Sequence, residues 1–142
     1  MTTRQLLKSL IAIPSLTPGD AGSIDILKGL LQQNNFQTQI LESNNLLSLY
    51  ATHGIQKPNI CFSGHVDVVP PGPLEAWNSD PFVLTEVNGN LYGRGTADMK
   101  SGVAAMTTAA IDYVTQNPNH PGTVSLLFTS DEEDSSRFGT PY

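Results

Sequence analysis

Apolar residues recur at helical spacing in two segments near the amino terminus. The first segment predicts a helix that begins at Thr2 or Thr3, ends before Pro14, and buries Leu6, Leu7, Leu10 and Ile11. The second predicts a helix that begins near Asp20 or Ser23, frays at Asn34 and Asn35, and buries Ile24, Leu27, Leu30 and Leu31. Both helices carry their apolar residues on one face, so each is expected to cover a core.

Shorter patterns predict strands joined by tight turns. Residues 37–42 and 46–52 flank Asn44 and Asn45, which favours a turn between two neighbouring strands. The pair Asn88-Gly89 lies between FVLTEV and LYGRG and is a strong signal for a second hairpin.

Two continuous apolar runs and one alanine-rich segment complete the predicted order of elements. Residues 59–64 (NICFSG) and 122–130 (GTVSLLFTS) are each typical of a buried strand, the first of a strand covered on both faces. Residues 99–117 predict a helix between them that ends at Asn117-Pro118. Strands that alternate with helices favour an α/β layered fold with a partly parallel sheet.

Composition restricts the partners and the compartment. The 142 residues include seven Lys and Arg against thirteen Asp and Glu, a net charge of −6, and the basic residues are scattered along the chain. Nucleic acid and anionic membrane surfaces are therefore poor partners, and no window is apolar enough to span a membrane. The single cysteine, Cys61, cannot form an internal disulfide, and its apolar context predicts a buried side chain in a protein of the reducing cytoplasm.

Acidic and imidazole side chains follow the predicted strands at three places. His65 and Asp67 follow the strand 59–64, Asp98 precedes the helix 99–117, and the run Asp131 to Asp134 follows the strand 122–130. Ligands of open α/β sheets bind at the carboxyl ends of the strands, so these groups are expected to converge. Clustered carboxylates repel one another unless a cation compensates, and this ligand set suits zinc, manganese or cobalt. Asp67, two residues along an extended segment, would orient the His65 ring.

Each signal also has a simpler interpretation. An isolated His-x-Asp is most often surface decoration, and the acidic run is most often a solvated turn or helix start. The string GRGTAD has Asp98 where a dinucleotide-binding loop has its third glycine, so that interpretation is weak. The chain has neither a phosphate-binding loop nor the serine elbow of hydrolases.

The combination of motifs in this order resembles one family. GHVDVVPPG, WNSDPF, GRGTADMKSG and LLFTSDEED are similar to the amino-terminal part of the two-zinc aminoacylase and carboxypeptidase metallopeptidases, and the resemblance covers essentially the whole chain. It implies a three-layer catalytic domain with a mixed, largely parallel sheet. It also implies that residues 1–142 are a truncated amino-terminal part of that domain, without the lid and dimerisation domain.

The resemblance implies a role for each matching residue. His65 would bind the first metal, Asp98 would bridge two metals, and Glu133 would bind the second. Asp67 would orient His65, and Glu132 would be the general base. The peptide bond after Asp98 is expected to be cis. Two zinc ions per full-length subunit are implied, with cobalt or manganese as substitutes.

The wording of the motifs is most similar to the desuccinylase branch of the family. That branch hydrolyses N-succinyl-L,L-2,6-diaminopimelate to succinate and L,L-diaminopimelate, in lysine and diaminopimelate biosynthesis. The resemblance implies a cytoplasmic homodimer acting on a small N-acyl amino acid, and an inactive fragment in the chain as it stands. The alternatives are an acetylornithine deacetylase, a glutamate carboxypeptidase, a dipeptidase, or a non-catalytic module that keeps the fold.

Overall fold

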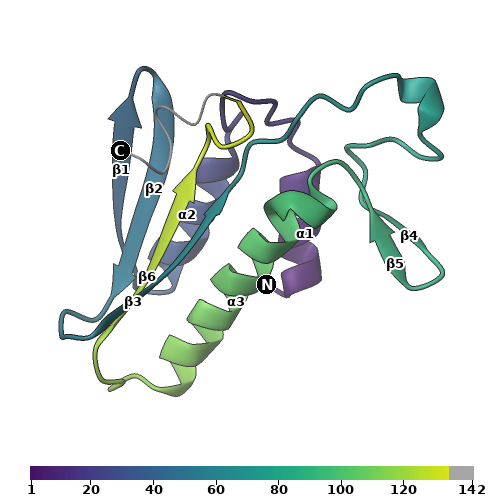
Figure 1. Cartoon of the computed structure of the whole chain (residues 1–142). Coiled ribbons are helices and arrows are strands. Elements are labelled where there is room, and N and C mark those ends of the chain that lie inside the picture. Colours follow the sequence, from purple (N-terminus) through teal and green to yellow (C-terminus); the bar gives the residue numbers. More distant parts are fainter. Residues whose placement is uncertain (135–142) are drawn as a thin grey trace.

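The computed structural model describes residues 1–134, which form three α-helices, a four-stranded sheet and a small hairpin (Figure 1). A 3₁₀ turn spans Leu74–Ala76, and a π-type turn spans Thr96–Lys100. The elements are α1 Thr3–Ile11, α2 Ser23–Gln33, β1 Gln37–Ser43, β2 Leu46–His53, β3 Asn59–His65, β4 Thr85–Val87, β5 Asn90–Tyr92, α3 Ser101–Gln116 and β6 Thr123–Thr129.

The main sheet has the strand order β1-β2-β6-β3. The β1·β2 and β2·β6 pairs are antiparallel and the β3·β6 pair is parallel. The sheet is therefore mixed, as predicted, although only one of its three pairs is parallel. The hairpin β4-β5 forms a separate two-stranded sheet that projects away from the main sheet (Figure 1).

The three helices pack on one face of the main sheet. In the register, Leu49 lies opposite Phe128 and Ala51 opposite Leu126, and all four side chains belong to one buried cluster with residues of α1, α2 and α3. The predicted helical face of α1 is fully confirmed, whereas Leu30 of α2 is only partly buried. Burial of these apolar side chains is the main force that holds the helices against the sheet.

The turns form where the sequence indicates them. Asn44 and Asn45, between β1 and β2, and Asn88 and Gly89, between β4 and β5, all have positive φ, as tight hairpin turns require. The Thr2 side chain accepts a hydrogen bond from the Gln5 N–H, and the Gln5 side chain returns one to Thr2, so a capping box begins α1.

Two expectations about burial are wrong. The strand 59–64 was expected to be covered on both faces, but β3 lies at the edge of the sheet and the side chains of Ile60 and Phe62 are 58% and 47% exposed. Cys61, expected to be buried, is exposed as well. The physical reason is that, within residues 1–134, β3 pairs on one side only, and α3 leaves an open groove beside Ile60 and Phe62.

The strand 122–130 is buried, as its apolar run predicts. β6 lies between β2 and β3, with Leu126 and Phe128 fully buried. Within residues 1–134, β1 and β3 are the two edge strands of the sheet. Among residues 1–134, no helix is long and apolar enough to pass through a membrane.

Two histidines form a pair at the end of the sheet where β2 ends and β6 begins. His53 Nδ1 and His120 Nε2 lie 2.8 Å apart, and the rings pack with Phe36 and Tyr113. A hydrogen bond between two imidazoles needs at least one neutral ring. Burial and the nearby His120 lower the pKa of His53 below its ordinary value.

This pair predicts a loss of stability in mild acid. A His whose pKa is lower in the folded state destabilises the fold as the pH falls below the unfolded value, about 6.5, and the effect levels off below the folded pKa. Urea unfolding between pH 7.5 and 5 should show this fall in the free energy of unfolding. The variant His53→Phe, which keeps a ring beside Phe36, should lack that component. Identical pH slopes for the two proteins would contradict the prediction.

Candidate metal centre

His65 is the centre of a group of acidic side chains at the carboxyl end of β3. Its ring is buried, and its Nε2 lies 3.0 Å from Asp98 Oδ1 and 3.7 Å from Glu132 Oε2. Its Nδ1 lies 3.0 Å from the main-chain oxygen of Asp67. One ring nitrogen is thus held by the backbone while the other faces the carboxylates.

Asp67 is fully buried beneath this ring and holds two segments of the chain together. Its Oδ1 lies 3.5 Å from His65 Nδ1. The main-chain oxygen of Asp67 is closer to the same nitrogen, at 3.0 Å. Its Oδ2 accepts hydrogen bonds of 3.0 Å from the N–H groups of both Glu132 and Glu133. Burial opposes ionisation, but the hydrogen bonds from His65 and from these N–H groups outweigh it and lower the pKa of Asp67.

Asp98 reaches the site from the π-type turn that precedes α3. The Asp98-Met99 peptide bond is cis, as expected, and Asp98 and Met99 have non-helical dihedral angles inside the turn. The Asp98 side chain is 72% exposed, so it faces open space on the outer side of the cluster.

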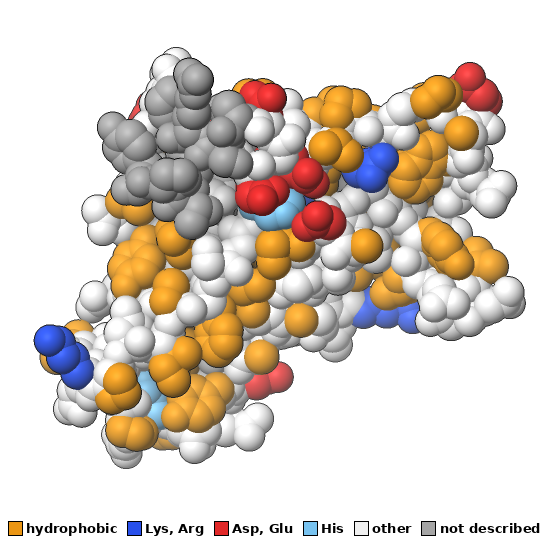
Figure 2. Space-filling view, viewed as in Figure 1, with side chains coloured by type: hydrophobic (Ala, Val, Ile, Leu, Met, Phe, Trp, Pro, Cys, Tyr) orange, Lys and Arg blue, Asp and Glu red, His pale blue; other side chains and the backbone are white. Residues whose placement is uncertain are grey.

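The structure brings His65, Asp98 and Glu133 together. One ligand atom from each side chain lies within 4.8 Å of the other two. Figure 2 shows acidic side chains gathered around a histidine on this face, near the carboxyl ends of β3 and β6. Glu132 flanks the cluster with its side chain half exposed, whereas Asp131, from the same acidic run, is buried.

The charges of this cluster favour a bound cation. The pKa of Glu133 is raised, first by burial and second by the neighbouring charge of Asp98. Burial disfavours the charged form of His65, yet its contacts with Asp67 and Asp98 raise its pKa to about 9. A positive charge beside these carboxylates relieves their mutual repulsion, and a divalent cation would provide it. One imidazole and two carboxylates are a ligand set suited to zinc, manganese or cobalt.

Lys100 is a buried charged residue of this region that sequence reasoning did not place. Its side chain is fully buried, and Nζ donates to the main-chain oxygens of Leu10 at 2.9 Å and Ile13 at 2.7 Å. Burial lowers its pKa to about 8, against the opposing charge of Asp67. Lys100 therefore ties the end of α1 to the segment that carries Asp98.

Arg94 and Trp77 hold the loop that follows Asp67. The Trp77 Nε1–H donates to Pro71 O at 2.9 Å, and Arg94 Nη2 donates to Pro70 O at 3.3 Å. The Arg94 guanidinium lies 5.3 Å from the centre of the Trp77 ring. These contacts connect the Pro70-Pro71 turn to the segment that leads to Asp98.

Comparison with known proteins agrees with this geometry. Residues 61–142, more than half of the chain, match the profile of Peptidase family M20/M25/M40. The chain belongs to this family. Succinyl-diaminopimelate desuccinylase of Coxiella burnetii is 51% identical over 138 residues, which are 97% of this chain and 37% of that protein. The chain therefore spans about 37% of the length of such relatives.

Solved structures of the family share the fold. Human carnosine dipeptidase 1 has a TM-score of 0.83 and 26% identity, over 96% of this chain and 33% of that protein. The metallo-carboxypeptidase Sso-CP2 of Sulfolobus solfataricus has a TM-score of 0.84 over 94% of this chain and 32% of that protein, at 24% identity. Family membership and the cluster around His65 together support a bound metal.

Proposed function

We propose that this chain is the metal-binding, amino-terminal part of a succinyl-diaminopimelate desuccinylase. The observation that carries the proposal is the convergence of His65, Asp98 and Glu133 within 4.8 Å, in a chain 51% identical to such an enzyme. The reaction is hydrolysis of the amide of N-succinyl-L,L-2,6-diaminopimelate to succinate and L,L-diaminopimelate.

The proposed roles follow the geometry. His65 and Asp98 would hold one zinc ion, and Asp98 and Glu133 a second. Asp67 is a positioning residue, because it contacts the His65 ring and the backbone of Glu132 and Glu133. When bound, divalent zinc lowers the pKa of a water molecule and polarises the amide carbonyl.

Glu132 is proposed as the general base. Its carboxylate lies beside the cluster, 3.7 Å from His65 Nε2, and is half exposed, so a water molecule and a substrate amide can reach it. It would take the proton of the attacking water and then deliver it to the leaving amine as the C–N bond breaks. The Asp67 hydrogen bond to the Glu132 N–H fixes the backbone from which this side chain extends.

The cytoplasmic location, the homodimeric full-length form and the absence of nucleic-acid and membrane partners stay predictions of the sequence. The same is true of zinc as the metal, with cobalt or manganese as substitutes. They apply to the full-length protein, of which these residues would be the first part.

The test uses a completed protein, in which residues 1–142 are continued by the part of the Coxiella burnetii desuccinylase that follows the matched segment. The completed protein should release succinate from N-succinyl-L,L-diaminopimelate, lose this activity on chelation, and regain it with zinc. N-acetylornithine and dipeptides are the comparison substrates.

Two results would overturn the proposal. Faster hydrolysis of N-acetylornithine or of a dipeptide would indicate a related deacylase or peptidase. A folded, zinc-loaded protein without hydrolysis of any of these amides would indicate a non-catalytic module.

A further inference from the structure

The segment that joins α1 to α2 contacts all three loops that carry the candidate metal ligands. We call residues 10–19, from the last turn of α1 onward, the linking segment. Figure 1 shows this connection beside the carboxyl ends of β3 and β6. The linking segment contains no Asp, Glu, His or Cys, so it supplies no side chain suited to a metal. Its contacts must therefore act on the ligands through other residues.

The first contact is with the residues on either side of Asp67. The hydroxyl of the fully buried Ser15 donates to Val66 O at 2.6 Å, and the Val68 N–H donates to Ser15 O at 2.9 Å. The Thr17 N–H donates in turn to Val68 O at 3.0 Å. These three bonds hold the backbone before and after Asp67, from which its carboxylate extends.

The second contact is with the turn that carries Asp98. Lys100 Nζ donates to the main-chain oxygens of Leu10 at 2.9 Å and Ile13 at 2.7 Å. These oxygens lie at the carboxyl end of α1, where the helix dipole favours a positive charge. The Lys100 N–H also donates to Gly95 O at 2.8 Å, which closes the turn around Asp98. The buried ammonium thus fastens a closed turn to the linking segment.

The third contact is with the acidic run that follows β6. The Gly19 N–H donates to Ser130 O at 2.8 Å, one residue before the run begins. Ser130 is itself buried, and its hydroxyl donates to Leu47 O of β2 at 2.7 Å. The loop that carries Glu132 and Glu133 is therefore held from the linking segment and from the sheet.

The electrostatics of the site explain why such ties are needed. The three loops lie far apart in the sequence, and they bring carboxylates together that repel one another when no cation is bound. A segment that only connected two helices could satisfy its backbone groups against any neighbouring chain. Here the bonds go to each of the loops that must stay together, and two of them come from the buried side chains of Ser15 and Lys100.

We propose that the linking segment holds the three ligand-bearing loops in place, with Ser15 and Lys100 as positioning residues of the metal centre. The loops then keep their spacing before a metal enters, so little of the binding free energy is used to order them. This inference rests on the metal centre of the proposed function, but it does not depend on the substrate or the reaction.

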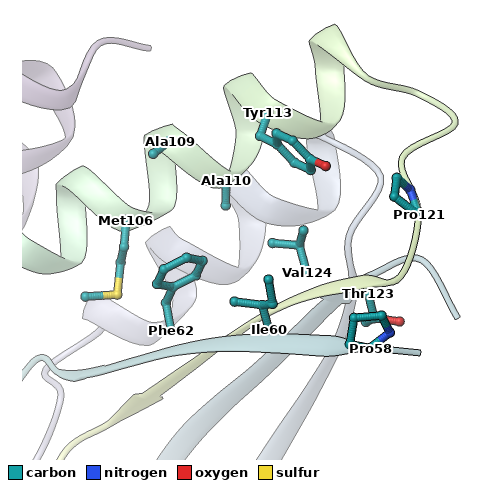
Figure 3. A pocket seen from close by; sticks show the side chains of 10 residues that line it. All are labelled: Pro58, Ile60, Phe62, Met106, Ala109, Ala110, Tyr113, Pro121, Thr123 and Val124. Atoms are coloured by element: carbon teal, nitrogen blue, oxygen red, sulfur yellow. The ribbon is translucent and has the colours of Figure 1, made fainter. Parts of the chain in front are cut away.

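The test compares Ser15→Ala and Lys100→Met with a matched control, Ser125→Ala, in the completed protein. Ser125 is also a fully buried serine, and its hydroxyl donates to Asn59 Oδ1 at 2.8 Å. It is next to Val124, which lines the apolar groove between β3 and α3 (Figure 3). It lies four residues along β6 from Thr129, the partner of His65, or about 13 Å away.

Zinc affinity is the first measurement, by competition with a zinc-binding dye. Affinity should fall about tenfold or more in Ser15→Ala and in Lys100→Met, and less than about twofold in Ser125→Ala. Thermal unfolding of the metal-free proteins separates this effect from stability. Ser15→Ala and Ser125→Ala each remove one buried hydroxyl, so they should lower the Tm by similar amounts.

Hydrogen exchange in the metal-free proteins is the second measurement. Asp67 accepts hydrogen bonds from the N–H groups of Glu132 and Glu133, so a displaced Asp67 leaves these groups less protected. Exchange in the peptide that contains them should be about fivefold faster or more in Ser15→Ala and unchanged in Ser125→Ala. A role of Ser15 in stability alone would not produce this difference.

Two results would overturn the inference. One is equal zinc affinity in Ser15→Ala and Ser125→Ala, and the other is equal exchange of the Glu132 and Glu133 amides in these two variants. If Lys100→Met does not fold, Ser15→Ala decides alone. An unaltered protein that binds no zinc, but whose Glu132 and Glu133 amides exchange faster in Ser15→Ala, would refute the proposed metal centre and leave the linking segment as the tie between the loops.

Discussion

Replacing Glu132 by Gln in the completed protein should lower kcat for N-succinyl-L,L-diaminopimelate about a thousandfold. The amide has nearly the same size as the carboxylate but cannot accept a proton from water. The backbone position should persist, because the Asp67 carboxylate binds the N–H of residue 132 and not its side chain. KM and zinc content should therefore change little, and steady-state kinetics with metal analysis would show this separation.

A matched control is available one residue further along. Glu133→Gln changes the same functional group, but its expected effect is weaker metal binding, because Glu133 belongs to the cluster of possible ligands. Activity lost through Glu133→Gln should return in part at high zinc concentration, whereas that of Glu132→Gln should not. A kcat for Glu132→Gln within tenfold of the unaltered protein would remove Glu132 from the role of general base.

Local sequence signals were sufficient for most of the fold. The apolar spacing of α1 and the asparagines of the two hairpins describe interactions within a few residues, and the structure has them in place. Sequence patterns were less informative about which strand lies at the edge. The apolar run of β3 shows that the strand can be covered, but it does not show which part of the polypeptide covers it.

The candidate site, too, was predictable from the sequence only in part. Placement of charged groups after the strands predicted that His65, Asp98 and the acidic run would meet, and the structure brings them together. The buried position of Lys100 was not predicted, because its partners Leu10 and Ile13 are about ninety residues away in the sequence. The two hydrogen bonds that Asp67 accepts from the N–H groups of Glu132 and Glu133 also span more than sixty residues, so no local pattern indicates them.

These long-range contacts of Asp67 give the second prediction, for Asp67→Asn in the completed protein. The Asn oxygen can still accept the N–H groups of Glu132 and Glu133, so its NH₂ group would replace the oxygen that lies 3.5 Å from His65 Nδ1. Two N–H donors would then face each other, which disfavours the ring orientation that leaves Nε2 available for metal. We expect the affinity for zinc to fall about 10- to 100-fold.

Competition with a zinc-binding dye would measure this loss, and Asp112→Asn serves as the control. Asp112 is an exposed carboxylate of α3, so its substitution makes the same change in net charge without touching His65. Since the Asn side chain has nearly the same volume as Asp, the folded structure should persist, and circular dichroism would verify it. Equal zinc affinity in the two variants would show that the main-chain oxygen of residue 67, 3.0 Å from Nδ1, is sufficient to orient the ring.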